Sequence, residues 1–505
     1  MKRIVSIISV LAMATTALAQ SRSFDDFKQK QNARFEQFQM DKQAEFDAFR
    51  KKQNERYAEF MKHNWEPLNA QPAVVPEEEK KVPPVVYEVP ITTPTTQPTH
   101  TPTTLPMPKE DSNPILVKNE VIVVPQPQPI PEPIAPVEPK KELPYKPYAI
   151  AFYGTLVSIG FPTNDIFRLN GLSEQQLSEA WVQLSSEAYD ITLKNVLDAR
   201  KNLALCDWGY VKMLQAISEK KYGNTNEAVF MQTFLLSQSG YKVRLATDNQ
   251  KLYLLIASQY SILSMIYYVI DNTKFYALNC KSKSLNICNA SFDNEKSISL
   301  QLRNEQNLEI LPTPPRKLTS KYGITANVTT NKNTIDFFND YPSAYINNDP
   351  TTCWAVYANT PLDQSIKNEL YPALKQQLNG LSEYDAVNTL LNFVQTAFVY
   401  EYDNKVWGHD RAFFAAETLH YPYADCEDRS ILFSRLVRDI LGLDVVLLYY
   451  PGHLATAVAF TKDVEGDYLM YKNRKYIIAD PTYINASVGM TMPDMNNQEA
   501  RIIAL

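Results

Sequence analysis

The stretch Tyr421-Pro-Tyr-Ala-Asp-Cys-Glu-Asp-Arg-Ser430 decides how the second half of this chain folds. Residues 431–441 after it carry apolar side chains at helical spacing, and Gly442 is a typical residue just beyond a helix end. Cys426 is therefore predicted to lie where a helix begins. The unpaired N–H groups of a helix N-terminus carry about half a positive charge, which stabilises a thiolate.

Two further polar residues follow at the ends of predicted strands. Residues 444–450 and 453–460 are typical of strands joined by a Pro-Gly turn, so His453 opens the second of them. Residues 476–480 predict another strand, and the proline after it keeps Asp480 extended. A cysteine, a histidine and an aspartate in these positions can act as nucleophile, base and orienter.

Three motifs carry a resemblance to a known family. Asp425-Cys-Glu-Asp428, Gly452-His453 and Ala479-Asp480-Pro481 resemble the transglutaminase-like superfamily, which has a papain-type fold and a Cys/His/Asp triad. Ala416-Glu-Thr-Leu419 ahead of them is similar to bacterial periplasmic transglutaminase-like cysteine peptidases. The resemblance covers roughly residues 381–483.

The resemblance implies an α+β fold, in which a helix packs on an antiparallel sheet, and a cysteine peptidase or amidase that uses Cys426, His453 and Asp480. The reaction would pass through a thioester. Hydrolysis by water is favoured by the resemblance, although a lysine amine in place of water would make a crosslinking transglutaminase. His409 and His420 are less favoured bases, because they precede the nucleophile in a loop.

Aromatic residues precede the nucleophile and are candidates for the wall of a cleft that holds a protein or peptide substrate: Trp407, Tyr421 and Tyr423. A different class of function stays open. Both halves of the chain could instead form a non-catalytic scaffold that binds a peptide or a component of the cell envelope.

Asp425 and Glu427 flank the predicted nucleophile. The resemblance implies that acidic residues at these positions contribute to a calcium site, and hard oxygen ligands suit calcium. No other cofactor is expected. Alternatively, Glu427 and Asp428 only favour the helix N-terminus through the helix dipole. Two carboxylates beside Cys426 would raise the pKa of its thiol, and a bound cation would relieve that conflict.

The N-terminal 66 residues divide into two predicted parts. Residues 1–19 have a basic start, an apolar run and an Ala-Leu-Ala end, which predict a signal peptide and export to the periplasm or beyond. No later run approaches the ~18 apolar residues of a membrane-spanning helix.

Residues 20–66 are predicted to form a helix. Its aromatic pairs repeat every 11 residues, at 24/27, 35/38, 46/49 and 57/60, so the aromatic side chains lie along one stripe of the helix surface. The stripe favours self-association, or it packs on its own protein.

The rest of the chain divides into a linker and two predicted lobes. Residues 67–144 are rich in proline and predict a disordered spacer. Residues 145–311 repeat the helix–hairpin order of the lobe at 312–505, which suggests a duplication, unless such patterns recur by chance. Aligning Gly240 with Gly442, with a one-residue gap before the last position, sets the first lobe's counterparts of the triad, which predict a degenerate, non-catalytic lobe: Asn224, Lys251 and Asn279.

Cysteine content and charge limit the remaining possibilities. Of the five cysteines, Cys280 and Cys288 could pair in an oxidising compartment, or they could stay free. The chain has only 13 glycines and a net charge of -6, which disfavours nucleotide-binding loops and binding to nucleic acid.

Overall fold

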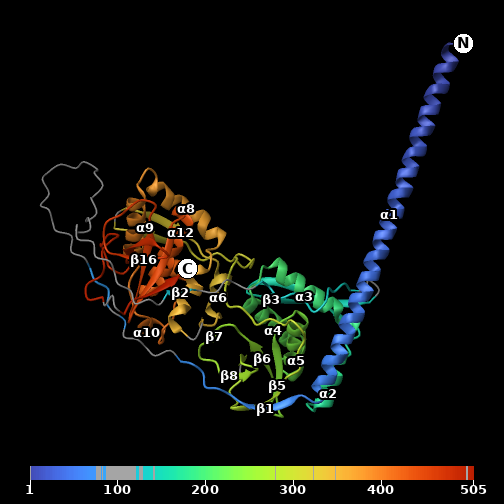
Figure 1. The fold of residues 1–505 in the computed structure, drawn as a ribbon, viewed down its shortest axis with the longest axis horizontal. Helices are drawn as coiled ribbons and strands as arrows, with labels where there is room; N and C mark the ends of the chain where they lie inside the picture. The colour runs from blue at the N-terminus through green and yellow to red at the C-terminus, as the bar shows by residue number, and fades with distance from the viewer. Residues whose placement is uncertain are drawn as a thin grey trace.

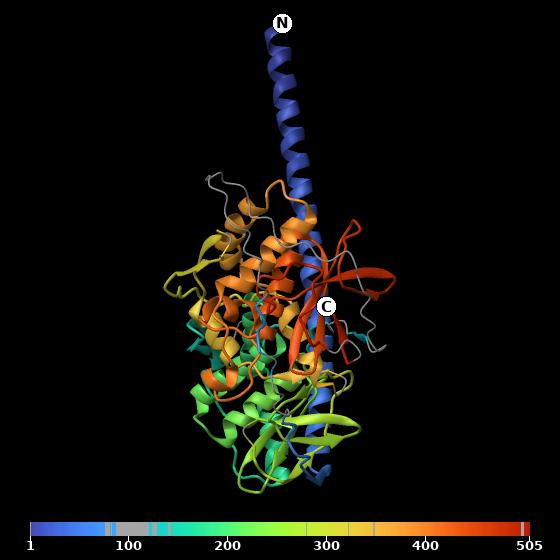
Figure 2. The same cartoon turned by 90° about the vertical axis from the view of Figure 1, so that its left-hand side faces the viewer.

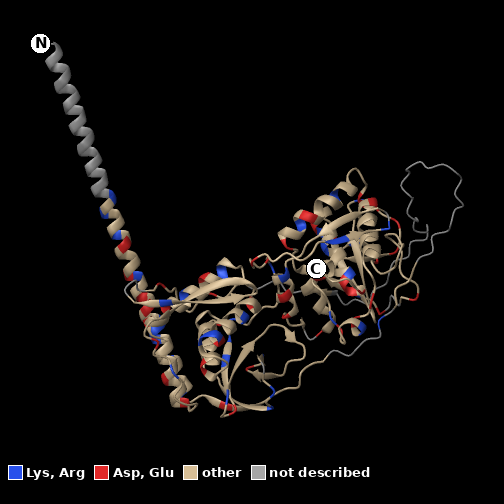
Figure 3. Cartoon of the chain, turned by 180° about the vertical axis from the view of Figure 1, so that it is seen from behind, with Lys and Arg blue, Asp and Glu red and all other residues tan. Residues whose placement is uncertain are grey.

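A computed structural model describes residues 2–75, 81, 83–86, 121–123, 129–139, 143–278, 280–321, 323–346, 349–495 and 499–505, with side chains in the first helix from residue 28 onward. The predicted α+β class is confirmed: helices pack on antiparallel sheets. Figure 1 shows the first lobe, in green, between the N-terminal helix and the second lobe, in orange and red. Acidic and basic residues are interspersed over both lobes (Figure 3).

The N-terminal helix α1 (Lys2–Met61) includes the aromatic repeats and projects from the first lobe (Figures 1 and 2). The helix was predicted to extend to residue 66. It ends at Met61 instead, because Trp65–Asn69 form strand β1. Among its described side chains, from residue 28 onward, only those of the last turns are packed: Tyr57 stacks on Trp181 with ring centroids 4.2 Å apart, and Arg50 pairs with Asp190 at 2.6 Å. The stripe therefore packs on its own protein at one end.

The first lobe consists of four main helices and eight strands. The helices are α2 (Glu174–Leu184), α3 (Asp190–Asn202), α4 (Asp207–Tyr222) and α5 (Asn226–Gln238). The strands are β3 (Tyr145–Phe152), β4 (Thr155–Pro162), β5 (Val243–Thr247), β6 (Leu252–Ala257), β7 (Ser261–Ile262), β8 (Tyr267–Ile270), β9 (Thr273–Ala277) and β10 (Ser284–Cys288).

The second lobe consists of helices that precede a sheet, as its predicted order requires. The helices are α6 (Lys332–Asn339), α7 (Cys353–Asn359), α8 (Gln364–Leu378), α9 (Glu383–Ala397), α10 (Asp403–Val406), α11 (Ala415–His420) and α12 (Cys426–Leu441). The strands are β11 (Arg316–Thr319), β12 (Thr325–Val328), β13 (Ala344–Tyr345), β14 (Asp444–Tyr450), β15 (His453–Ala459), β16 (Tyr468–Tyr471), β17 (Arg474–Ala479) and β18 (Arg501–Ala504). Strand β13 pairs with β7 and so joins the two lobes.

The main sheets of the two lobes share one strand order. The first runs β8-β9-β6-β5-β10 and the second β16-β17-β15-β14-β18, with antiparallel neighbours throughout both runs. Helix α5 leads into β5 as α12 leads into β14. This topology agrees with the predicted duplication. Of the first lobe's triad counterparts, Asn224 and Lys251 are exposed, and Asn279 lies outside the described residues.

The proline-rich segment does not behave as a free spacer where it is described. Strand β1 adds to β10 at the edge of the first sheet, and β2 (Val121–Val123) adds to β18 at the matching edge of the second. Residues 131–137 also pack on the first lobe, where the N–H of Ile134 donates to the Gln238 carbonyl at 3.0 Å. These pieces contain Val, Ile and Trp residues whose backbone groups complete existing sheet edges, which offsets their ordering entropy.

Of the two alternatives for Cys280 and Cys288, a disulfide or free thiols, the structure has free thiols, and all five cysteines are free. Strands β9 and β10 are separated in the sheet by β6 and β5, so the two cysteines do not face each other across a hairpin. Among the described residues, no helix is long and apolar enough to cross a membrane.

Candidate active site

Helix α12 begins at Cys426, as predicted, and places this thiol in the interior of the second lobe. Cys426 is 2% exposed. The residue before it, Asp425, donates its backbone N–H to Asp428 Oδ2 at 3.3 Å. The helix ends at Gly442, whose φ of 67° is a left-handed conformation that glycine adopts without strain.

Two buried side chains hold the first turn of α12 against its neighbours. The Arg429 guanidinium donates to the carbonyls of Gln395 and Phe398, at 3.1 and 2.9 Å, at the end of α9. Ser430 Oγ donates to the Leu454 carbonyl at 2.8 Å, next to His453 on β15. The start of the helix therefore lies beside the start of the strand that carries the histidine.

His453 and Asp480 form the predicted base–orienter pair. His453 Nε2 lies 2.8 Å from Asp480 Oδ2, and both side chains are buried. The other oxygen of Asp480 accepts the N–H of Thr482 at 2.8 Å, and Gln395 Nε2 donates to the Asp480 carbonyl at 3.1 Å. These contacts fix the carboxylate and, through it, the imidazole ring.

The second ring nitrogen of His453 is the one that a nucleophile would use. Nδ1 is buried and has no hydrogen-bond partner among the described residues. The thiol of Cys426 does not fill this position, because its Sγ donates to Glu427 Oε2 at 3.0 Å. The predicted thiolate–imidazolium contact is therefore not made in this structure, although all three triad residues lie in the predicted local structures.

The charge around Cys426 favours a neutral thiol in this arrangement. Burial, followed by the negative charges of Glu427 and Asp425, raises the pKa of Cys426 well above its ordinary value, and Lys81 acts in the opposite direction. The helix dipole and the flanking carboxylates were expected to act on the thiol in opposite directions. While Cys426 Sγ donates to Glu427, the carboxylates have the larger effect and the thiol stays neutral.

Lys81 is the main contributor to the site that sequence reasoning missed. Its ammonium Nζ contacts Asp425, lies 2.5 Å from Glu427 Oε1 and 2.9 Å from Asp410 Oδ1, and is 3.4 Å from Asp403 Oδ2. We call these four carboxylates the acidic pocket. Burial lowers the pKa of Lys81, but the negative charges of Glu427, Asp425 and their neighbours together raise it by more. The net pKa is therefore above its ordinary value, and the amine stays protonated. Its place in a proline-rich segment gave no pattern that could reveal this role.

The acidic pocket includes both residues predicted to bind calcium. Three groups of side chains each have ligand atoms close enough to hold one ion: Asp425, Cys426 and Glu427; Asp403, Asp410 and Glu427; and Asp403, Asp425 and Asp428. The last two groups consist of carboxylates alone. The donor set is of the hard oxygen kind that calcium prefers. Lys81 Nζ lies among these oxygens and already supplies a positive charge there. Calcium at Asp425 and Glu427 stays a prediction, and it would require Lys81 to move.

The predicted cleft aromatics separate into two places. Trp407 and Tyr421 contact each other with ring centroids 4.9 Å apart, and the guanidinium of Arg411 lies 4.7 Å from the Trp407 ring centroid. Arg411 is held there by Glu417. Tyr423 is 39% exposed and does not belong to this cluster; its backbone forms a bridge with Val399.

Neither alternative base replaces His453. His420 Nδ1 bonds to Thr330 Oγ1 at 2.8 Å, and burial lowers the pKa of this histidine. His409 is exposed, and its Nδ1 lies 3.1 Å from the Trp407 carbonyl.

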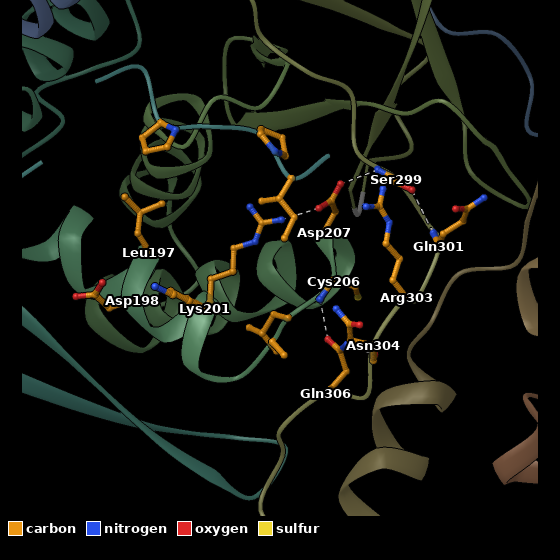
Figure 4. Close-up of a pocket in the computed structure, with 16 residues that line it drawn as sticks. Leu197, Asp198, Lys201, Cys206, Asp207, Ser299, Gln301, Arg303, Asn304 and Gln306 are labelled. Atoms are coloured by element: carbon orange, nitrogen blue, oxygen red, sulfur yellow. Dashed lines mark hydrogen bonds and ion pairs between the residues drawn. The ribbon is translucent and has the colours of Figure 1, made fainter. Parts of the chain in front are cut away.

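A cavity of about 490 Å³ lies in the first lobe, away from all these residues (Figure 4). It is lined by the end of α3, the start of α4 and residues 299–306. Its buried carboxylate, Asp207, already accepts from Arg200 at 2.6 Å, from the Tyr241 hydroxyl at 2.7 Å and from the Ser299 N–H at 2.8 Å. These saturated contacts are typical of a structural ion pair.

No protein-family model, curated protein or solved structure matches this chain.

Proposed function

We propose that this protein is an exported cysteine hydrolase of transglutaminase-like fold that cleaves a peptide or amide bond. The observation that carries the proposal is the state of His453. Its Nε2 is bound to Asp480 and its buried Nδ1 is left unpartnered among the described residues, at the start of β15 next to the start of α12. A histidine oriented in this way by a carboxylate is prepared to accept a proton from a nearby nucleophile.

In the proposed reaction, the thiol proton of Cys426 moves to His453 Nδ1. The sulfur then bonds to the substrate carbonyl carbon, and the carbonyl oxygen becomes an oxyanion that the backbone N–H of Cys426 stabilises. Collapse of this intermediate expels the amine, which takes the proton from His453 and leaves a thioester. Water attacks the thioester, gives a proton to His453 and releases the acid and the thiol. Asp480 keeps the imidazole oriented throughout.

The thiol must first leave its hydrogen bond to Glu427. A rotation of the Cys426 side chain toward His453 exchanges a carboxylate acceptor, which raises the pKa of the thiol, for an imidazole acceptor, which becomes a cation and lowers it. The arrangement in which the thiol donates to Glu427 is thus a resting state. Entry of substrate accompanies the rotation of the Cys426 side chain toward His453.

The test is a mass-spectrometric search for new peptide termini after the mature chain is incubated with a mixed peptide library. Cleavage that disappears in Cys426→Ala and persists in Cys353→Ala supports the proposal, because Cys353 is a second free thiol in the same lobe. A library that stays uncut would overturn it in favour of the non-catalytic binding protein. Incorporation of a fluorescent primary amine in place of cleavage would identify a crosslinking transferase instead.

A further inference from the structure

The acidic pocket collects four carboxylates from three parts of the second lobe around a single nitrogen. Asp425 and Glu427 come from the start of α12, Asp403 from α10, and Asp410 from the loop after α10. The side chains of Asp403, Asp425 and Glu427 are at most 5% exposed. Carboxylates buried this close together repel one another, and burial together with the neighbouring charges raises the pKa of Asp425 well above its ordinary value. A cation among them relieves this repulsion.

The pocket also retains unused acceptor capacity. Asp425 Oδ1 is buried and has no hydrogen-bond partner among the described residues, while its other oxygen contacts Lys81 Nζ. An ammonium group has three N–H donors on one compact charge, which suits several carboxylate oxygens converging from different directions better than a planar guanidinium does.

The lysine that fills the pocket comes from outside the lobe's own sequence. It is 346 residues before Glu427, in the proline-rich segment. A few residues on, the Val85 carbonyl accepts the Ile484 N–H at 2.8 Å, and Val86 forms a parallel bridge with Ile484. Ile484 lies four residues after Asp480. Lys81 therefore lies at the carboxylates that flank Cys426, and Val85 and Val86 lie at the loop that follows Asp480.

We propose that the acidic pocket is a binding site for a primary ammonium group, which Lys81 fills in cis, and that the lysine side chain of a peptide substrate takes its place. The second part rests on the proposed function, whereas the first does not. The segment at 81–86 then acts as a tethered competitor of lysine-containing substrates.

The ammonium site is tested by chemical rescue in the full mature chain. Lys81→Ala should lower the melting temperature by several degrees, since the carboxylates lose their cation. Added n-butylammonium should restore it with saturable dependence, and tetramethylammonium at equal ionic strength should not, because it has no N–H to donate. Lys81→Met, which keeps the aliphatic stem, should respond in the same way.

Lys405→Ala is the matched control, because Lys405 pairs with Glu401 on the surface of the same region. It should show neither the loss nor the rescue. Absence of an amine-specific recovery in both Lys81 variants would overturn the ammonium site, as would recovery with Ca²⁺ but not with n-butylammonium, which would make the pocket a metal site.

The substrate part is tested with the peptide library. Lys81→Ala should cleave it faster than the unmodified chain, with lysine enriched at one fixed position from the cut bond. Cleavage without such enrichment would overturn the substrate assignment alone. If no variant cleaves any peptide but n-butylammonium still restores stability, the proposed function fails and the ammonium site stands.

Discussion

The two nitrogens of His453 have different roles. Nε2 is bound to Asp480 at 2.8 Å, which sets the tautomer and the ring orientation, and this leaves Nδ1 for the proton of the nucleophile. The Thr482 N–H and the Gln395 amide in turn hold Asp480. In the proposed reaction the imidazole becomes a cation, and because His453 and Asp480 are both buried, the charge on Asp480 stabilises that cation.

Replacing Asp480 with asparagine tests this role. The shape is kept, but the negative charge that stabilises the imidazolium is lost, so the rate of peptide cleavage should fall on the order of 10²- to 10⁴-fold. Initial rates at fixed peptide concentration measure the effect. Asp463→Asn is the control, because Asp463 lies on the surface and pairs with Lys475. A rate within about twofold of the unmodified chain would mean that Asp480 has only a structural role.

At the scale of elements, α12 is positioned by its neighbours more than by its own sequence. Arg429 binds the carbonyls at the end of α9, and Gln395 from that same end of α9 binds the carbonyls of Asp480 and Tyr483. One helix end thereby connects the nucleophile's helix to the loop of the orienting aspartate. Small shifts of α9 should move both parts of the triad together.

The N-terminus of α8, next to α9, contains a buried acid that makes stability depend on pH. Burial, and then the charge of Glu305, raises the pKa of Asp363 to about 7. The folded state therefore holds the proton more tightly than the unfolded chain does, and stability is lost as the pH rises from about 4 to about 7. Asp363→Asn removes the titrating group and should remove this dependence.

Urea unfolding at two pH values measures the effect of Asp363. Between about pH 5 and about pH 8, the unmodified chain should lose roughly 2–3 kcal/mol of unfolding free energy relative to Asp363→Asn. Equal pH dependence in the two proteins would show that Asp363 already ionises normally in the fold.

At the scale of the whole molecule, the N-terminal segment joins the two lobes. It adds β1 to the edge of the first sheet, inserts Lys81 beside Cys426 and then adds β2 to the matching edge of the second sheet. The two sheets share one strand order and so have matching edges, and one chain segment uses both. The chain segment that follows α1 therefore links this helix to the candidate active site.

The outer part of α1 predicts self-association. Phe35, Phe38, Phe46 and Phe49 are 60, 57, 38 and 48% exposed, whereas Tyr57 farther along the same stripe is 2% exposed on its own lobe. Exposed aromatic residues at a regular helical spacing favour pairing with another helix. The mature chain should elute as an oligomer in size exclusion with light scattering, and changing these four phenylalanines to serine should give the monomer.

Four exposed glutamines of the same helix provide the control for that experiment: Gln29, Gln31, Gln37 and Gln39. Their replacement by serine should leave the oligomer unchanged. A monomer in the unmodified chain would show that the exposed stripe does not associate with itself.

The amino-acid sequence by itself determined the local elements of the candidate site. The helix from Cys426, the hairpin whose second strand begins with His453 and the strand before Asp480 follow from periodicity and turn residues, which act over a few positions along the chain. The shared order of elements in the two lobes was also predictable, because it repeats the same local signals.

Only the tertiary structure decided what surrounds Cys426. Lys81 and Glu427 are 346 residues apart, and a proline-rich segment has no periodicity to indicate where it will dock. The hydrogen bond of the thiol to Glu427, rather than to His453, depends on the same convergence of charges. Contacts of this kind arise where remote segments meet, so their energy is a property of the packed molecule and leaves no pattern in any one stretch of sequence.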